Sequence, residues 1–168
     1  MEHKQYRTKR GFTLIELLIV IAIIAILAAV AFVALDPLTR FRDARDSARW
    51  ADITAIINAI KIDQVDHRGQ YIYSIANATT SWTFLISAAT TTSGCNVTCD
   101  QAIATSSSCL NLNDLVTRGY LGELPVSPDG DQTWTSTLTG YYIQKNATGN
   151  IKIGSCESEN SSSVSVIH

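Results

Sequence analysis

The chain has 168 residues, of which 46% are hydrophobic, and a formal net charge of −2. This length accommodates one membrane helix and one small domain but no second core of ordinary size. Without residues 1–11 the chain keeps 9 basic and 14 acidic residues, a net charge of −5, which argues against a broad non-specific nucleic-acid surface and leaves only a localised patch open.

Residues 1–10 are polar and basic, and they indicate a processing or targeting segment rather than part of a fold. Their four cations favour a cytoplasmic N-terminus, although arginines also follow the apolar run, at positions 40, 42, 45 and 49. An ordinary secretory signal with a small-residue cut site at Ala29-Val30-Ala31 is the competing interpretation. The carboxylate of Glu16 fits the apolar core of such a signal poorly.

The segment 12–35 is apolar apart from Thr13 and Glu16 and contains no Gly or Pro. As a helix it would be roughly 36 Å long, enough to cross a bilayer core of about 30 Å. Its apolar residues surround the helix instead of forming a stripe, so it needs lipid or complete burial. We therefore predict a membrane-spanning helix.

Glu16 is the unusual residue of this helix, because a carboxylate in hydrocarbon costs at least about 2.5 kcal/mol on insertion scales and tends to find a partner. A cut between Gly11 and Phe12 would create an α-amine of opposite charge about one helical turn away. The two charges could pair within one helix, or between neighbouring subunits, where the pairing would set the axial stagger. The alternative is a Glu16 side chain that snorkels to the membrane interface.

The stretch Lys9-Arg10-Gly11-Phe12-Thr13-Leu14-Ile15-Glu16 and the apolar run behind it resemble the leader and N-terminal motif of type IV pilins and type II secretion pseudopilins. The resemblance implies that a membrane peptidase cuts after Gly11, that the same enzyme methylates the Phe12 amine, and that Glu16 meets this amine on an adjacent subunit during assembly. It also implies three kinds of partner: copies of the chain or related pilins in a helical filament, an assembly ATPase, and a platform membrane protein.

Beyond the apolar run, Asp36-Pro37 is expected to kink or loosen the helix without ending it, because proline removes one backbone hydrogen bond. In the pilin family this proline usually lies a few residues earlier, where the chain has Val33. The helix is expected to continue until Gly69 stops it. The predicted parts are a leader (1–11), a transmembrane helix (12–35), an amphipathic continuation of the helix (36–69) and an extracytoplasmic domain (70–168).

Within the amphipathic continuation, four isoleucines recur on one face, at positions 53, 56, 57 and 60. We expect this face to pack against the domain. Arg45, Arg49 and Asp52 are assigned to the other face, as a solvated surface of the helix. Arg42 and Asp46, at i,i+4, are expected to stabilise the helix slightly.

The domain is expected to be of the α+β class. Residues 70–108 are rich in Ser, Thr, Ala and Asn, and are interpreted as a long connecting region with exposed loops. Strand-like patterns follow at 120–125 and 133–138, and residues 141–153 predict a hairpin around a turn at 146–150. A small antiparallel sheet across the isoleucine face is the arrangement that pilins adopt.

Glycosylation is left open by the sequence. Four Asn-x-Ser/Thr sequons occur, at Asn77, Asn96, Asn146 and Asn160. Such sequons arise often by chance in a chain rich in Ser and Thr. The sequence does not choose among them.

Four cysteines, Cys95, Cys99, Cys109 and Cys156, allow three full pairings, and sequence alone does not select one. A structural zinc site is weakly supported, since no second closely spaced pair and no nearby His accompany Cys95 and Cys99. Outside the cytoplasm disulfides are favoured. The favoured pairing is Cys109 with Cys156, and Cys95 with Cys99 as a local loop.

Asp129 and Asp131 flank Gly130 and could offer oxygen ligands to calcium, as loops of secretion pseudopilins do. Two carboxylates make a poor site, and a polar turn is the favoured interpretation, so no metal site is predicted. The fuller loop pattern of the major secretion pseudopilin is missing.

No catalytic motif emerges from the sequence. Its three histidines lie in the leader, at a helix end and at the last position, and there is no phosphate-binding glycine loop or nucleophile elbow. We therefore expect no enzymatic activity and no cofactor.

The expected function is that of a structural filament subunit, held by its N-terminal helix in the cytoplasmic membrane with the N-terminus inside and then extracted into a periplasmic or extracellular filament. The alternative is a membrane-anchored minor pilin at a filament tip, which binds a ligand or surface in adhesion or DNA uptake.

Overall fold

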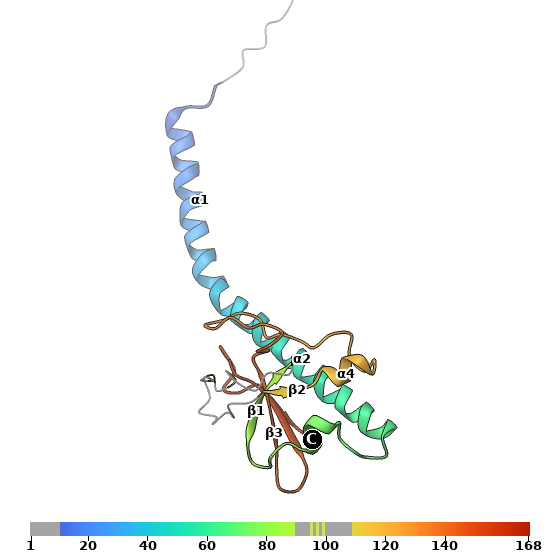
Figure 1. The fold of residues 1–168 in the computed structure, drawn as a ribbon. Helices are drawn as coiled ribbons and strands as arrows, with labels where there is room; N and C mark the ends of the chain where they lie inside the picture. The colour runs from blue at the N-terminus through green and yellow to red at the C-terminus, as the bar shows by residue number, and fades with distance from the viewer. Residues whose placement is uncertain (1–10, 90–94, 96, 98, 100–108) are drawn as a thin grey trace, which may run out of the picture. The chain divides into compact units, whose positions relative to one another are not determined.

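The computed structural model describes residues 11–89, 95, 97, 99 and 109–168. The chain divides into two compact units, Met1–Leu38 and Thr39–His168. The first contains helix α1, and the second contains most of helix α2 and a five-stranded sheet (Figure 1). Each unit is described by itself below.

Helix α1, Leu14–Leu35, is capped by Thr13 and buries none of its 22 residues. Its side chains are apolar on all sides except for Glu16. Among the described residues, only the helical run that begins with α1 is long and apolar enough to cross a membrane. The apolar helix predicted from composition is confirmed.

The junction between α1 and α2 is a single residue, Asp36, with φ 36° and ψ 69° in the left-handed region. Helix α2, Pro37–Asp66, starts directly after it with proline at a first helical position, where the missing N–H costs nothing. Val33, at the family's usual proline position, stays helical. The interruption therefore falls at the predicted place.

Helix α2 supplies one wall of the main core. Its four isoleucines at positions 53, 56, 57 and 60 are 0–2% exposed, so the predicted packing face is confirmed. The prediction of a solvated charged face was wrong for Arg49, which is 0% exposed, and Asp46 beside it is 3% exposed. These two residues lie four and seven positions before Ile53, so the helical period places them on the same face as the isoleucines. Gly69, with φ 83°, follows the end of the helix and donates to Gln64 O.

The sheet has the strand order β2-β1-β3-β4-β5. Strands β3 (Tyr141–Lys145) and β4 (Ile151–Ser155) form the predicted hairpin, and all pairs are antiparallel except the parallel pair of β1 and β2. Two short helices accompany the sheet. The remaining elements are α3 (Tyr73–Ala76), β1 (Thr83–Ser87), β2 (Leu110–Asn111), α4 (Asn113–Thr117) and β5 (Ser165–Ile167).

Some strand predictions were wrong. Strand β1 lies in the segment expected to be a connecting region, whereas residues 120–125 form no strand and residues 133–138 form only an isolated bridge between Thr135 and Leu138. The segment Thr83–Ser87 shows no polar alternation because Leu85 and Ile86 are buried in different clusters on the two faces of the sheet. The sheet is thus larger than predicted and not purely antiparallel.

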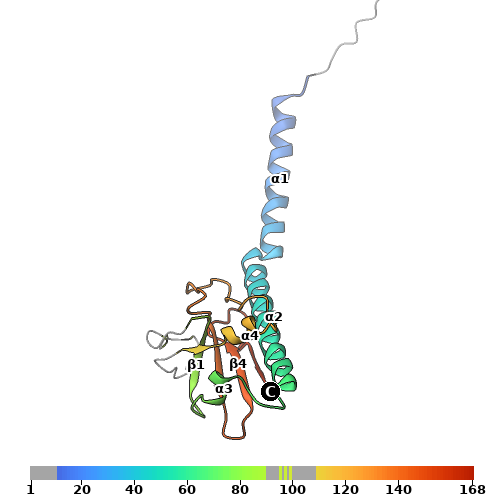
Figure 2. The ribbon, with the colours of Figure 1, turned by 45° about the vertical axis from the view of Figure 1, so that its right-hand side comes forward.

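Two hydrophobic clusters occupy the two faces of the sheet. Tyr141 and Ile143 of β3 point into the main cluster with the isoleucines of α2, and Tyr142 between them points into the second cluster. Figure 2 shows α2 running along one side of the sheet. On the other side, the ring of Tyr142 lies over Gly154, where an added Cβ would come within 2.4 Å of it. The result is an α+β arrangement with α2 on one face only.

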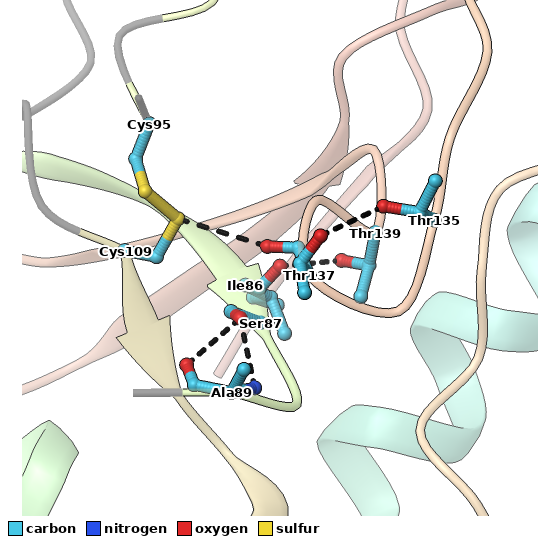
Figure 3. Close-up of a disulfide and its surroundings, with 8 residues drawn as sticks. All are labelled: Ile86, Ser87, Ala89, Cys95, Cys109, Thr135, Thr137 and Thr139. Atoms are coloured by element: carbon cyan, nitrogen blue, oxygen red, sulfur yellow. Dashed lines mark hydrogen bonds between the residues drawn. A yellow bond between two sulfur atoms is a disulfide. The ribbon is translucent and has the colours of Figure 1, made fainter. Parts of the chain in front are cut away.

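All four cysteines form disulfides, but the favoured pairing was wrong. The bonds join Cys95 to Cys109 (Figure 3) and Cys99 to Cys156. Their Cα–Cα distances are 5.3 and 4.5 Å. Cys109 directly precedes β2 and Cys156 directly follows β4, and β1 and β3 lie between these two strands. Three strand spacings amount to about 14 Å, beyond the roughly 7 Å that a disulfide can bridge.

Candidate functional site

The start of α1 forms a reciprocal cap between Thr13 and Glu16. The Thr13 hydroxyl accepts from the Glu16 N–H at 3.3 Å, and the Glu16 carboxylate accepts from the Thr13 N–H at 2.8 Å and from its hydroxyl at 2.7 Å. This capping box satisfies backbone donors that have no partner within the first helical turn. Inside a membrane no water would replace these bonds, so the cap defines where the helix begins.

The cap leaves part of the Glu16 carboxylate available. Both bonds from Thr13 go to Oε2, and among the described residues Oε1 has no hydrogen-bond partner and no cation pairs with the side chain. A carboxylate has about four acceptor positions. Glu16 can therefore cap its own helix and still accept a cation from another chain.

The peptide bond between Gly11 and Phe12 lies just before the helix, in a segment without regular structure. Phe12 is 82% exposed, and no atom lies within 4 Å of the position that a Cβ on Gly11 would take. A peptidase needs an extended and open peptide around the bond that it cuts. The bond predicted to be cut is accessible on its Phe12 side.

Thr13 is the residue of this site that the sequence analysis missed. The spacing Thr-x-x-Glu before an apolar run is a known signature of a capping box and was visible in the sequence. The sequence predicted that Glu16 pairs with the Phe12 amine, within one helix or between subunits, or that it snorkels to the membrane interface. The structure adds the cap that Glu16 forms with Thr13 at the start of its own helix.

The family described as Prokaryotic N-terminal methylation motif matches residues 6–32 of the chain. The chain carries the N-terminal methylation motif of type IV pilins and pseudopilins. The matched stretch contains the Gly11–Phe12 bond, the capping box and most of α1. The comparison with curated proteins gave no match, and neither did the comparison with solved structures.

Outside the methylation motif, the fold itself is pilin-like. A long N-terminal helical run leads into a mostly antiparallel five-stranded sheet, and α2 covers one face of that sheet. The resemblance in fold thus extends to the part of the chain that the motif does not cover. Pilins are in general structural proteins without enzymatic activity.

A second polar site lies in unit 2 and centres on the buried Arg49. Its guanidinium donates to Asp46 Oδ1 at 2.8 Å, to Glu159 Oε1 at 3.0 Å and to Glu157 Oε2 at 3.2 Å. It also donates to Ser127 Oγ at 3.2 Å and to Pro128 O at 3.1 Å. These five bonds employ every guanidinium nitrogen of Arg49 and attach two distant loops to α2.

Two of the carboxylates around Arg49, those of Asp46 and Glu159, have a lowered pKa and are held in the charged form. Burial opposes ionisation of Asp46, but the backbone N–H groups of residues 159–161 and the Arg49 guanidinium outweigh it and lower the pKa of Asp46 below its ordinary value. The hydrogen bond from Arg45 is the main reason that the pKa of Glu159 is lowered. The site is therefore a structural clamp between α2 and the residues after β4.

Of the two aspartates considered as calcium ligands, Asp129 forms a hydrogen bond within the chain. Its Oδ1 accepts from the N–H of Trp134, five residues later, at 3.0 Å. Next to it, Gly130 faces the charged clamp, where an added Cβ would lie 3.0 Å from Glu157 Oε2 and 3.1 Å from an Arg49 nitrogen. In the part of the chain that the structure describes, no group of three or more His, Cys, Asp or Glu residues could hold a metal ion.

Proposed function

We propose that the chain is a prepilin that is cut between Gly11 and Phe12, methylated on the new Phe12 amine, and assembled through α1 into a helical filament of the type IV pilus or type II secretion kind. The observation that carries the proposal is the methylation motif at residues 6–32 together with an apolar helix that buries none of its residues within the chain.

The free energy of assembly would come from α1. An apolar helix of 22 exposed residues is stable in lipid or among other apolar helices but not in water. In the membrane lipid covers it, and in a filament the same helix of neighbouring copies covers it. The subunit can therefore pass from one setting to the other without exposing this surface to water.

Glu16 would set the register of the filament. The cleaved chain has an amine at Phe12, and the free Oε1 of Glu16 on a neighbouring copy is a suitable acceptor for it. A copy displaced along the axis would leave both charges without a partner in an apolar core, which is costly. Correctly staggered copies are favoured by that difference.

The partners follow from this route. A prepilin peptidase that also acts as methyltransferase processes the N-terminus, and an assembly ATPase acts through a platform membrane protein. The chain starts in the cytoplasmic membrane as a single-pass protein with its N-terminus inside. It ends in a periplasmic or extracellular filament and needs no cofactor.

The first experiment is the intact mass and N-terminal sequence of the protein from the envelopes of its source cells. A chain that starts at Phe12 with one added methyl group supports the proposal. A start at Met1 would leave a tethered module, and a start after Ala31 would indicate an ordinary secreted domain. Either of these outcomes contradicts the proposal.

A minor subunit at a filament tip is the second candidate, and two exposed aromatic side chains favour it. Tyr73 is 78% exposed and Trp82 is 55% exposed on unit 2, a feature common in binding surfaces. The copy number of the chain in purified filaments separates the two roles. A major subunit makes up most of the filament mass, whereas a tip subunit is present in few copies.

A further inference from the structure

The sequons differ in what their asparagine amides do. Asn77 directly follows helix α3, and its Nδ2 donates to Tyr73 O at 2.9 Å. Asn160 donates its Nδ2 to Asp43 Oδ1 at 2.8 Å and to Thr39 O at 3.2 Å, which ties it to α2. Both amide nitrogens are engaged within the fold. The sequon at Asn96 lies outside the described residues.

Asn146 is engaged through its oxygen instead. Its Oδ1 accepts from the Thr148 N–H at 3.1 Å, from the Thr148 hydroxyl at 2.7 Å and from the Asn150 N–H at 2.8 Å. Two of these donors are backbone N–H groups, which can only face an acceptor, so the orientation of the amide is fixed. Its Nδ2 consequently points away from the loop and has no partner among the described residues.

The surroundings of Asn146 are open. Residues 146–150 join β3 to β4, and Asn146, Ala147 and Thr148 are all exposed. In Figures 1 and 2 this loop projects from the end of the sheet that lies away from the start of α2. The loop keeps its form through Gly149, whose φ is 91° and whose carbonyl accepts from the Tyr71 hydroxyl at 3.0 Å.

We propose that Asn146 carries an N-linked glycan, transferred outside the cytoplasm from a saccharide bound to a lipid pyrophosphate. Nδ2 forms a bond to the anomeric carbon of the sugar as the bond from that carbon to the pyrophosphate oxygen breaks. The lipid pyrophosphate leaves with the electron pair, and one Nδ2 proton passes to a base of the transferase. Atoms and charge balance without an oxidant or reductant.

Thr148 has a defined part in this step. Its hydroxyl and N–H both donate to Oδ1, which draws electron density from the amide nitrogen towards the oxygen and makes the Nδ2 protons more acidic. The same two bonds hold the nitrogen outward. Asn77 and Asn160 would first have to give up their bonds to the fold, and in Asn160 those bonds join the clamp segment to α2.

The test is peptide mass mapping of the full chain purified from its source cells, before and after treatment with a glycoamidase that releases the glycan and converts the glycosylated Asn to Asp. The expected result is a glycan mass on the peptide with Asn146 and none on the peptides with Asn77 and Asn160. An unmodified Asn146 peptide overturns the proposal. Sugar on serine or threonine residues of that peptide, with Asn146 bare, overturns it as well.

Matched variants separate modification from folding. Asn146→Asp keeps the acceptor oxygen that holds the loop but removes Nδ2, and Thr148→Ser keeps both donors that Thr148 supplies. We expect loss of the glycan mass in Asn146→Asp and Thr148→Ala and its retention in Thr148→Ser. A glycan that persists on this peptide in Asn146→Asp would contradict the assignment. The N-terminal mass, measured on the same samples, tests the proposed filament function separately.

Discussion

Helices α1 and α2 follow each other in the chain but differ in how many of their residues are buried within it. Helix α1 buries none of its residues, whereas α2 buries eight, three of which are ionisable. The polar residue of α1 has a cap from its own helix and a free acceptor position, whereas Arg49 in α2 has all its nitrogens engaged. Helix α1 leaves its apolar surface without contacts in the chain, whereas α2 makes its contacts within the domain.

The largest effect is expected from Glu16→Ala. This change removes the carboxylate that we propose as the acceptor for the Phe12 amine, so we expect filaments to be lost while the protein still inserts in the membrane. Because α1 buries nothing within the chain, unfolding of the domain in urea should not change. Filament yield is measured against total membrane-bound protein, and normal filaments from the variant would show that Glu16 does not set the register.

The opposite pattern is expected from Arg49→Ala. Removal of the guanidinium leaves Asp46 and Glu157 buried without their cation, a loss of about 3–5 kcal/mol in the free energy of unfolding. Urea unfolding followed by circular dichroism gives this value. Arg45→Ala is the matched control, since the Arg45 side chain is 35% exposed and a much smaller loss is expected. Equal losses in the two variants would refute the clamp.

A third change tests the face of the sheet that α2 does not cover. Gly154→Ala would place a Cβ within 2.4 Å of the Tyr142 ring, and such overpacking costs about 1–3 kcal/mol. Gly122→Ala is the control, because no atom lies within 4 Å of its Cβ position. The difference between their melting temperatures reports on the packing of Tyr142. If both melt together, this face is loosely packed.

The smallest effect is a dependence of stability on pH. The pKa values of Asp46 and Glu159 are lowered from ordinary values of 3.8 and 4.5, so both favour folding at neutral pH, and this contribution is lost as the pH falls below about 4 towards the folded-state values. Burial raises the pKa of Asp52, against the hydrogen bond from Tyr141, so protonation of Asp52 acts in the opposite direction.

Unfolding free energies at pH 6 and pH 3 test this sign. Asp46→Asn should lose less stability than the unchanged protein on acidification, and Asp52→Asn should lose more. Each substitution replaces one carboxylate oxygen with an amide nitrogen and keeps a similar side-chain shape. A steeper loss in Asp46→Asn would show that the clamp does not hold its carboxylates in the charged form.

What the sequence predicted well depended on neighbouring residues. The continuous apolar run predicted α1, and the turn-forming residues between Lys145 and Ile151 predicted the hairpin. The cap of Thr13 was equally local and could have been predicted. Each of these features is specified by residues within one short window.

The features that the sequence did not predict depend on contacts between residues far apart in the chain. Arg49 is buried because Glu157 and Glu159, more than 100 positions later, return to α2. The disulfide pairing depended on a strand order that places β1 and β3 between β2 and β4. Strand β1 was missed because its neighbours bury both of its faces, which removes the alternation on which a strand prediction rests.

The bond between Cys99 and Cys156 spans 57 positions of sequence and links residues of the second hydrophobic cluster. Thiols stay reduced in the cytoplasm and are oxidised outside it. In the topology proposed above, this cross-link closes only after the β3–β4 hairpin has been translocated across the membrane. A subunit in which this disulfide has formed is therefore one whose domain has already been exported. The redox state of Cys99 and Cys156 distinguishes exported subunits from those that are still in the membrane with the domain inside.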